Sequence, residues 1–134
     1  MQNDEYFSLA QIRLDRAKEL IDEAEVLLAN ESYKSANNRA YYSIEKSLSA
    51  LLAVSHTLTQ THKGCLLQFN QIYVRTGLGG FNSEDYRLAS NAEQIRNASD
   101  YDDFYITGKQ EAGEQVEAAK YLYDKVLAYI ISPD

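Results

Sequence analysis

The sequence predicts an all-α fold, an antiparallel up-and-down bundle of four to five helices, from three observations. Apolar residues recur every three or four positions along most of the 134-residue chain, the period of helices packed against a core. One proline and six glycines leave few residues that would interrupt long helices. Strand-like alternation is absent and the connectors are short, which favours antiparallel neighbours. This length suits one hydrophobic core, so we expect a single domain over residues 1–134.

The first two predicted helices cover about residues 6–29 and 33–54. Each carries one apolar stripe, formed by Ala10, Leu14, Ala17, Ile21, Ala24 and Leu28 in the first helix and by Ala36, Ala40, Ile44, Leu48 and Leu51 in the second. Ser32 is expected to cap the second helix, because a serine oxygen can accept from a first-turn N–H. The small residues of the second stripe would let a neighbouring helix approach closely.

Three further helices are predicted, over about residues 62–75, 83–100 and 107–131. The glycine-rich stretch 76–82 separates the first two of them, and the acidic, aromatic stretch 101–106 separates the last two. Ser83 is followed by two acidic residues, which suit a helix N-terminus. Thr107 and Gln110 match a capping box, and Pro133 is expected to stop the last helix.

Charge is unevenly spread along this acidic chain, whose net charge of −7 argues against a general nucleic-acid coat protein. Residues 1–32 sum to −5 (3 basic, 8 acidic), residues 33–82 to +4 (5 basic, 1 acidic) and residues 83–134 to −6 (5 basic, 11 acidic). The cationic middle has two interpretations. Its charges cancel those of the two ends when the helices pack, or they form a local anion site on an acidic surface.

Several function classes are disfavoured by residue usage. No apolar run is long enough to span a membrane, and the start of the chain lacks the basic and apolar regions of a secretory signal, so we expect no membrane association. The lone Cys65 cannot form an internal disulfide, which is consistent with the reducing cytoplasm. Two histidines and one cysteine are too few for a zinc site, and no Glu-x-x-His occurs, so we expect no metal and no cofactor.

The two histidines are expected at helix ends on the surface. His56 follows the second predicted helix, and His62 begins the third. The alternative for His62 is that it lines a site.

Residues 38–46, Asn-Arg-Ala-Tyr-Tyr-Ser-Ile-Glu-Lys, form the first segment that suggests a site. Tyr41 and Tyr42 point about 100° apart on a helix, so one can enter the core while the other faces a second surface. Arg39 and Tyr42 lie three residues apart and share a face, where the arginine can stack on the aromatic ring. The alternative is simple packing with a solvated arginine.

Residues 95–102, Ile-Arg-Asn-Ala-Ser-Asp-Tyr-Asp, form the second segment that suggests a site. Arg96 and Asp100 are spaced for a salt bridge within one helix. A cation near a helix C-terminus also suits the helix dipole. Spacing alone therefore favours a structural role for Arg96.

The order of several short motifs resembles the HEPN domain (higher eukaryote and prokaryote nucleotide-binding), in particular its small stand-alone prokaryotic group. The motifs are a first helix ending in Leu-Leu-Ala-Asn, residues 38–42 as Asn-Arg-Ala-Tyr-Tyr, residues 61–64 as Thr-His-Lys-Gly, the break at Thr76-Gly77, and Arg96 followed by Asp100-Tyr101-Asp102 before a long final helix. The resemblance covers nearly the whole chain. It implies a bundle of four or five helices, usually dimeric, that often partners a minimal nucleotidyltransferase in a toxin–antitoxin-like pair.

Other members of that family are metal-independent ribonucleases whose motif is an arginine, four to six residues and a histidine. Arg96 matches the arginine, but Tyr101 stands where the histidine is expected, and no histidine follows His62. A phenol with a pKa near 10 is a poor base at neutral pH, whereas an arginine still binds phosphate. Nucleotide or RNA binding therefore survives this departure better than cleavage does.

The resemblance and the residue chemistry together give three hypotheses. The leading one is a homodimeric HEPN-type nucleotide or RNA-binding module that acts with a nucleotidyltransferase. The alternatives are a ribonuclease toxin using Arg96 with Tyr101, or with His62, and a structural interaction domain without activity. The candidate catalytic residues are Arg96 and Tyr101, the candidate binding residues are Arg39, Tyr42, His62, Lys63 and Asp100, and the candidate adenylylation acceptors, implied by the resemblance, are Tyr101 and Tyr105.

Overall fold

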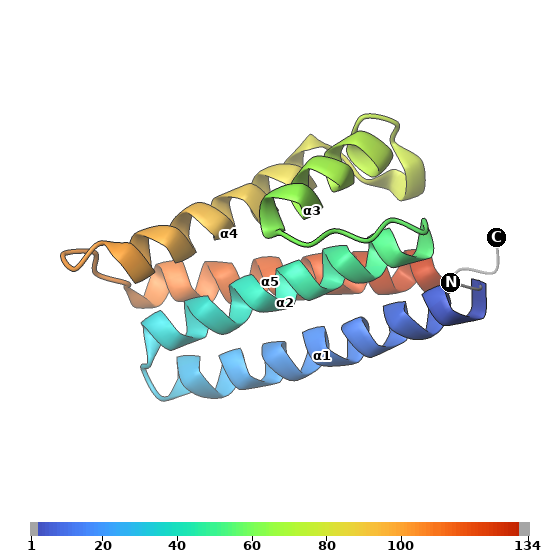
Figure 1. Ribbon diagram of the computed structural model, residues 1–134. Coiled ribbons are helices and arrows are strands. Elements are labelled where there is room, and N and C mark those ends of the chain that lie inside the picture. The colour runs from blue at the N-terminus through green and yellow to red at the C-terminus, as the bar shows by residue number, and fades with distance from the viewer. Residues whose placement is uncertain (1–2, 132–134) are drawn as a thin grey trace.

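The computed structural model describes residues 3–131, and within them every regular element is helical (Figure 1). The elements are α1 (Asn3–Ala29), α2 (Tyr33–Val54), α3 (His62–Phe69), the π-helical turn η1 (Asn70–Val74), the 3-10 turn η2 (Leu78–Gly80), α4 (Ser83–Tyr101) and α5 (Lys109–Ile131). The predicted all-α bundle is confirmed. Pro133, expected to stop the last helix, lies outside the described residues.

Helix α2 lies at the centre of the bundle and packs against α1, α3, α4 and α5. Figure 1 shows α1 on one side of α2 and α5, and α3 with α4 on the other. The four long helices alternate in direction, as short connectors require. Among the helices described, none is both long and apolar enough to cross a lipid bilayer.

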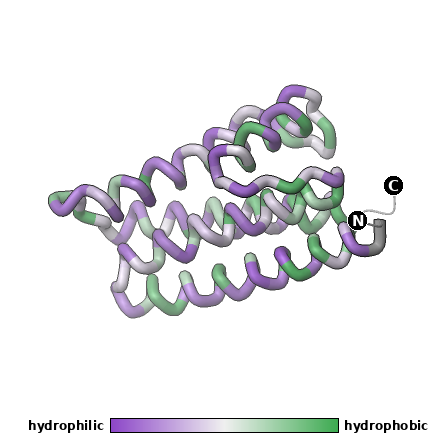
Figure 2. Tube along the Cα trace, viewed as in Figure 1, coloured by the Kyte–Doolittle hydropathy of each residue, from purple (hydrophilic) through white to green (hydrophobic). Residues whose placement is uncertain are grey.

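The predicted apolar stripes form the core. Every stripe residue of α2 is fully buried, and in α1 only Leu28 remains partly exposed. Figure 2 shows hydrophobic residues recurring at intervals along each helix rather than in continuous blocks. Alanines such as Ala17, Ala24 and Ala40 are completely buried, so small side chains let α1 and α2 approach closely.

An aromatic cluster anchors the break between α3 and α4. The rings of Phe69, Tyr73 and Phe81 pack edge to face or tilted, and Tyr129 of α5 completes the group. Gly79 has a φ of 70°, and a Cβ added there would lie 2.6 Å from the Tyr129 ring. Glycine is therefore required at this close approach.

Some predicted helix ends differ from the observed ones. Ser32 occupies the N-cap position of α2, but its side chain makes no capping hydrogen bond. The capping box predicted at the start of α5 is wrong, because Gln110 donates instead to Glu114 and the helix begins at Lys109. A capping box is found at α4, between Asn82 and Asp85.

Candidate functional site

Arg96 of α4 lies over two aromatic rings of α2. Its guanidinium carbon is 5.1 Å from the ring centre of Tyr41 and 5.7 Å from that of Tyr42. Its Nη2 also donates a hydrogen bond of 3.3 Å to the Tyr42 hydroxyl. The cation is therefore held in place by the faces of two rings, an arrangement that favours a partly desolvated arginine.

Asp100 pairs with the same guanidinium, as predicted. Its Oδ2 lies 3.0 Å from Arg96 Nε, one helical turn away. The contact lacks the alignment of a hydrogen bond, so the buried Nε of Arg96 has no hydrogen-bond partner in the part of the chain that the structure describes. Arg96 is fixed by the two rings and by the Asp100 carboxylate, and an arginine held in this way can bind an oxyanion through its remaining N–H groups.

His62 is buried, so the prediction that it lies on the surface is wrong. Its side chain is 8% exposed, because the cap at Thr61 starts α3 where the first turn packs between α2 and α4. The imidazole packs edge-on against Tyr41, with ring centres 4.8 Å apart. His56, by contrast, is exposed as predicted and stacks on Tyr6.

Two carboxylates flank the His62 ring. Nδ1 lies 3.5 Å from Glu45 Oε2, and Nε2 lies 3.7 Å from Glu93 Oε2. Neither ring nitrogen makes a hydrogen bond within residues 3–131. A buried imidazole in this state is uncommon, because buried polar groups are normally paired.

Electrostatics keep the neighbouring groups in defined protonation states. His62 lowers the pKa of the Glu45 carboxyl below its usual value and outweighs the burial that raises it, so Glu45 is ionised at neutral pH. Burial raises the pKa of the Tyr41 hydroxyl, which stays protonated and donates a 3.4 Å hydrogen bond to Glu45. The cluster of Tyr41, Tyr42, Glu45, His62, Glu93, Arg96 and Asp100, called here the Arg96 cluster, therefore combines fixed carboxylates, a cation and an imidazole.

The structure brings together four of the residues singled out in the sequence. Tyr42, His62, Arg96 and Asp100 all belong to the Arg96 cluster. Tyr41, Glu45 and Glu93 were missed. The sequence contains only weak indications of them. Glu45 lies four residues after Tyr41, and Glu93 lies three residues before Arg96, so each can share a helix face with its neighbour.

The other four candidates lie outside the Arg96 cluster, namely Arg39, Lys63, Tyr101 and Tyr105. Arg39 pairs with Glu23 of α1 at 2.9 Å, so its predicted stack on Tyr42 is wrong, and Arg96 takes that place. Lys63 is exposed at the start of α3.

The two candidate acceptor tyrosines differ in exposure and in partners. Tyr101 ends α4 and is 79% exposed. Tyr105 is hydrogen-bonded to Glu111, and that carboxylate raises the pKa of Tyr105 to about 12. Of the two, Tyr101 is therefore the accessible hydroxyl.

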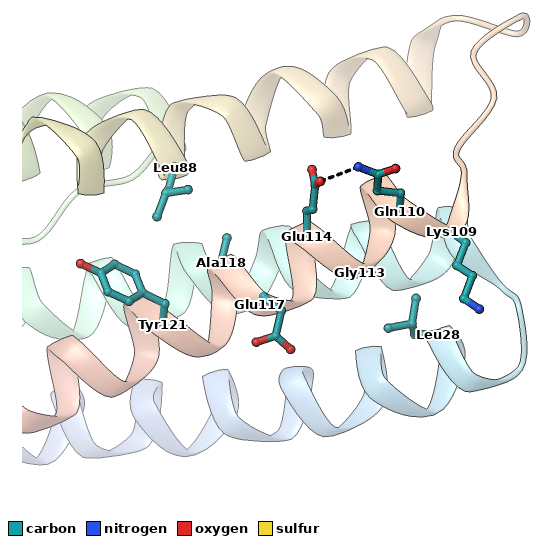
Figure 3. Close-up of a pocket in the computed structure, with 9 residues that line it drawn as sticks. All are labelled: Leu28, Leu88, Lys109, Gln110, Gly113, Glu114, Glu117, Ala118 and Tyr121. Carbon is teal, nitrogen blue, oxygen red and sulfur yellow. Dashed lines mark hydrogen bonds between the residues drawn. The ribbon is translucent and has the colours of Figure 1, made fainter.

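A large hollow of the described surface lies elsewhere and has a different character. It is a shallow, mainly apolar groove of about 860 Å³ beside α5 (Figure 3). Its lining residues are Leu28, Leu88, Lys109, Gln110, Gly113, Glu114, Glu117, Ala118 and Tyr121. None of the candidate site residues lines it. Over residues 3–131, no group of three or more His, Cys, Asp and Glu side chains is arranged to hold a metal ion.

Known proteins resemble this chain over nearly its whole length. A UPF0332 protein of Thermotoga maritima is 31% identical over 111 residues, which cover 83% of each chain. Two proteins of Methanocaldococcus jannaschii, each named "Putative toxin", are 26% identical over 119 residues and 28% over 117. These matches cover 89% and 87% of this chain and 80% and 84% of the relatives.

The family model described as the HEPN domain matches residues 10–129, which include parts of all five α-helices and every residue of the Arg96 cluster. The resemblance seen in the short motifs is thereby confirmed. The chain belongs to the HEPN domain family.

Proposed function

We propose that this HEPN-type module binds single-stranded RNA or a nucleotide at the Arg96 cluster. The observation that carries the proposal is the state of Arg96, which is held over two tyrosine rings and paired with Asp100, while its buried Nε–H makes no hydrogen bond within the described residues. An arginine can grip a phosphate with two parallel hydrogen bonds, and tyrosine rings can stack on bases. Tyr42 is half-buried, so its ring offers such a face next to the cation.

The acidic charge of the chain restricts such binding to a local surface. A net charge of −7 repels a polyanion from most of the molecule. The segment 33–82, which supplies Tyr42 and His62, is the one with net positive charge. Binding would therefore involve few phosphates and weaken only modestly with added salt.

A toxin–antitoxin-like pair is the biological setting we propose. Two relatives carry the name "Putative toxin". A minimal nucleotidyltransferase as partner is what the resemblance to the HEPN family implies. Three exposed apolar side chains, those of Tyr101, Phe104 and Ile106, lie at the end of α4 and in the connector that follows it, where a second copy or the transferase would dock. The lone Cys65 is free and buried, which suits the cytoplasm.

RNA binding is tested by fluorescence anisotropy with a labelled single-stranded RNA of about ten nucleotides. We expect Arg96→Gln to weaken binding at least tenfold, because it removes the one cation of the site. Arg87→Gln is the matched control, since Arg87 lies on the same helix but is exposed and paired with Glu84. Equal affinities of wild type and Arg96→Gln would exclude the Arg96 cluster as the binding site.

Partnership is tested by purification of the tagged protein from its native host and by light scattering. The proposal expects a homodimer and a co-purifying nucleotidyltransferase. A monomer at all micromolar concentrations, without any transferase, would leave the structural interaction domain as the better account.

A metal-independent ribonuclease is the second candidate, and the position of His62 favours it. The imidazole contacts Tyr41, the ring that Arg96 covers, so a proton-exchanging group lies near the cation although the motif histidine is replaced by Tyr101. Induced expression in a bacterium, with total RNA examined for new ends, tests it. Cuts that are lost in both His62→Gln and Arg96→Ala support the candidate, and uncut RNA with normal growth excludes it.

A further inference from the structure

Another hollow lies where α1, α2 and the start of α3 meet, and it adjoins the Arg96 cluster, with which it shares Glu45 and His62. It has a volume of about 210 Å³ and a mainly polar lining. The lining residues are Arg13, Glu45, Lys46, Ser49, Thr59, Gln60, Thr61, His62 and Cys65. Arg96 and Tyr42 do not line it, and we call it the Lys46 pocket.

Two cations of the Lys46 pocket lack a carboxylate partner. Arg13 donates a 3.0 Å hydrogen bond to the Ser49 carbonyl but forms no ion pair among the described residues, and Lys46 forms neither an ion pair nor a side-chain hydrogen bond there. Burial lowers the pKa of the Arg13 guanidinium, a sign of lost water without a compensating carboxylate. Arg16, three residues along α1, has carboxylates within reach.

The first turn of α3 adds backbone donors. The Thr61 hydroxyl accepts from the N–H of Gly64, and the Thr61 carbonyl accepts from the N–H of Cys65. The N–H groups of His62 and Lys63 have no partner within the helix. The positive end of the helix dipole therefore lies at the pocket.

The pocket also contains one carboxylate and one thiol, those of Glu45 and Cys65. The side chain of His62 is more than nine-tenths buried, has no hydrogen-bond partner among the described residues and lines the pocket, with Nδ1 facing the Glu45 carboxylate. Glu45 is ionised, so the two cations Arg13 and Lys46 outnumber the one carboxylate of the lining. Burial raises the pKa of the Cys65 thiol to about 12, so it stays neutral.

The size of the pocket selects a small ligand. Whole drug-sized molecules occupy pockets of about 300–1,000 Å³, whereas a water molecule takes about 30 Å³. A volume of about 210 Å³ therefore suits a tetrahedral anion better than a complete nucleotide. We propose that the Lys46 pocket binds a phosphoryl dianion, as free phosphate or as the terminal phosphate of a nucleotide, between Arg13, Lys46 and the first turn of α3.

The test is a titration of the full-length, ¹⁵N-labelled protein with inorganic phosphate, adenosine monophosphate and adenosine, followed by NMR. We expect phosphate and the monophosphate to shift the amide signals of Lys63 and Gly64, and adenosine to leave them unchanged. Similar affinities for phosphate and the monophosphate identify the free ion as the source. A monophosphate that binds at least tenfold tighter than phosphate identifies the nucleotide.

Lys46→Gln is the decisive variant. It is expected to weaken phosphate binding roughly tenfold or more, because it removes one charge-assisted contact. Lys34→Gln is the control, since it makes the same change on an exposed, unpaired residue of α2. Thermal melts of both variants show that they are folded.

Three results would overturn the proposal. They are unchanged amide signals at millimolar phosphate, equal phosphate affinity in wild type and folded Lys46→Gln, and adenosine binding as tightly as its monophosphate. The inference does not rest on RNA binding at the Arg96 cluster. Phosphate binding that persists in Arg96→Gln while RNA binding is lost would separate the two sites.

Discussion

Two polar groups are buried between the helices of this bundle, and they differ in how their hydrogen bonds are satisfied. Asp85 at the start of α4 is completely buried, and its oxygens accept from Tyr121 at 2.8 Å, from Lys125 at 2.7 Å and from the N–H of Asn82 at 3.1 Å. In the Arg96 cluster, the buried nitrogens of His62 and the Nε of Arg96 have no hydrogen-bond partner among the described residues.

The difference distinguishes a structural group from a candidate functional one. Removing one partner of a buried, fully hydrogen-bonded charge strongly destabilises the fold, whereas polar atoms that have no partner lose no such contact when they are replaced. A donor without a partner can bind a ligand. We therefore expect substitutions at the Asp85 group to change stability, and substitutions in the Arg96 cluster to change binding. Four substitutions test this contrast, from the largest expected effect to the smallest.

Asp85→Ala is expected to have the largest effect on stability. It leaves Lys125 without its carboxylate and removes the capping box of α4, so the free energy of unfolding should fall by about 3 kcal/mol. Urea unfolding measures the change, with the exposed Asp124→Ala as control. A loss below about 1 kcal/mol would contradict a structural role for Asp85.

His62→Leu is expected to change the free energy of unfolding by no more than about 1 kcal/mol, although only 8% of the side chain is exposed. The imidazole makes no hydrogen bond that leucine would forfeit, and the two flanking carboxylates are partly exposed and can take up water. The same urea experiment measures it. A loss as large as that of Asp85→Ala would show that the His62 contacts are structural.

The contribution of Glu45 to the free energy of unfolding is expected to depend on pH. Its folded-state pKa lies below the usual 4.5, so its contribution is fully present above the unfolded-state value and is lost as the pH falls through the folded-state value. The stability difference between wild type and Glu45→Gln should therefore be constant at neutral pH and shrink below about pH 4.5. A difference that grows on acidification would contradict the assigned contact with His62.

Tyr105→Phe is expected to have the smallest effect. The hydroxyl bonds to Glu111 at a partly exposed position, so its loss should cost about 0.5 kcal/mol. The pKa of Tyr105, about 12 in the wild type, should return toward its ordinary value in Glu111→Gln. Titration of ¹³C-labelled tyrosine by NMR measures it, and an unchanged pKa would exclude the Glu111 contact as the cause.

The sequence predicts most of the fold because helical periodicity is a local property. The stripes of α1 and α2, the break at Gly77 and the ion pair of Arg96 with Asp100 all follow from spacings of a few residues. The π-helical turn after Phe69 and the start of α5 do not, because tertiary packing and alternative side-chain partners decide them.

The candidate site was predictable only in part, because it joins three helices. Arg96 was recognised from its motif, but its place over Tyr41 and Tyr42, fifty-four and more residues away, depends on how α4 packs on α2. His62 was expected on the surface, since a helix end is usually exposed. Nothing near it in sequence reveals that Glu45 and Glu93 will flank its ring.

The most direct test of the contrast follows the arginine Nε–H signals by NMR while single-stranded RNA is added to the ¹⁵N-labelled protein. Our account predicts that the Arg96 Nε–H signal shifts as RNA binds, while the Arg87 Nε–H signal and the backbone amide of Asp85 stay in place. An Arg96 signal that is unchanged at RNA saturation would contradict it, because the unpartnered donor would then have no part in binding.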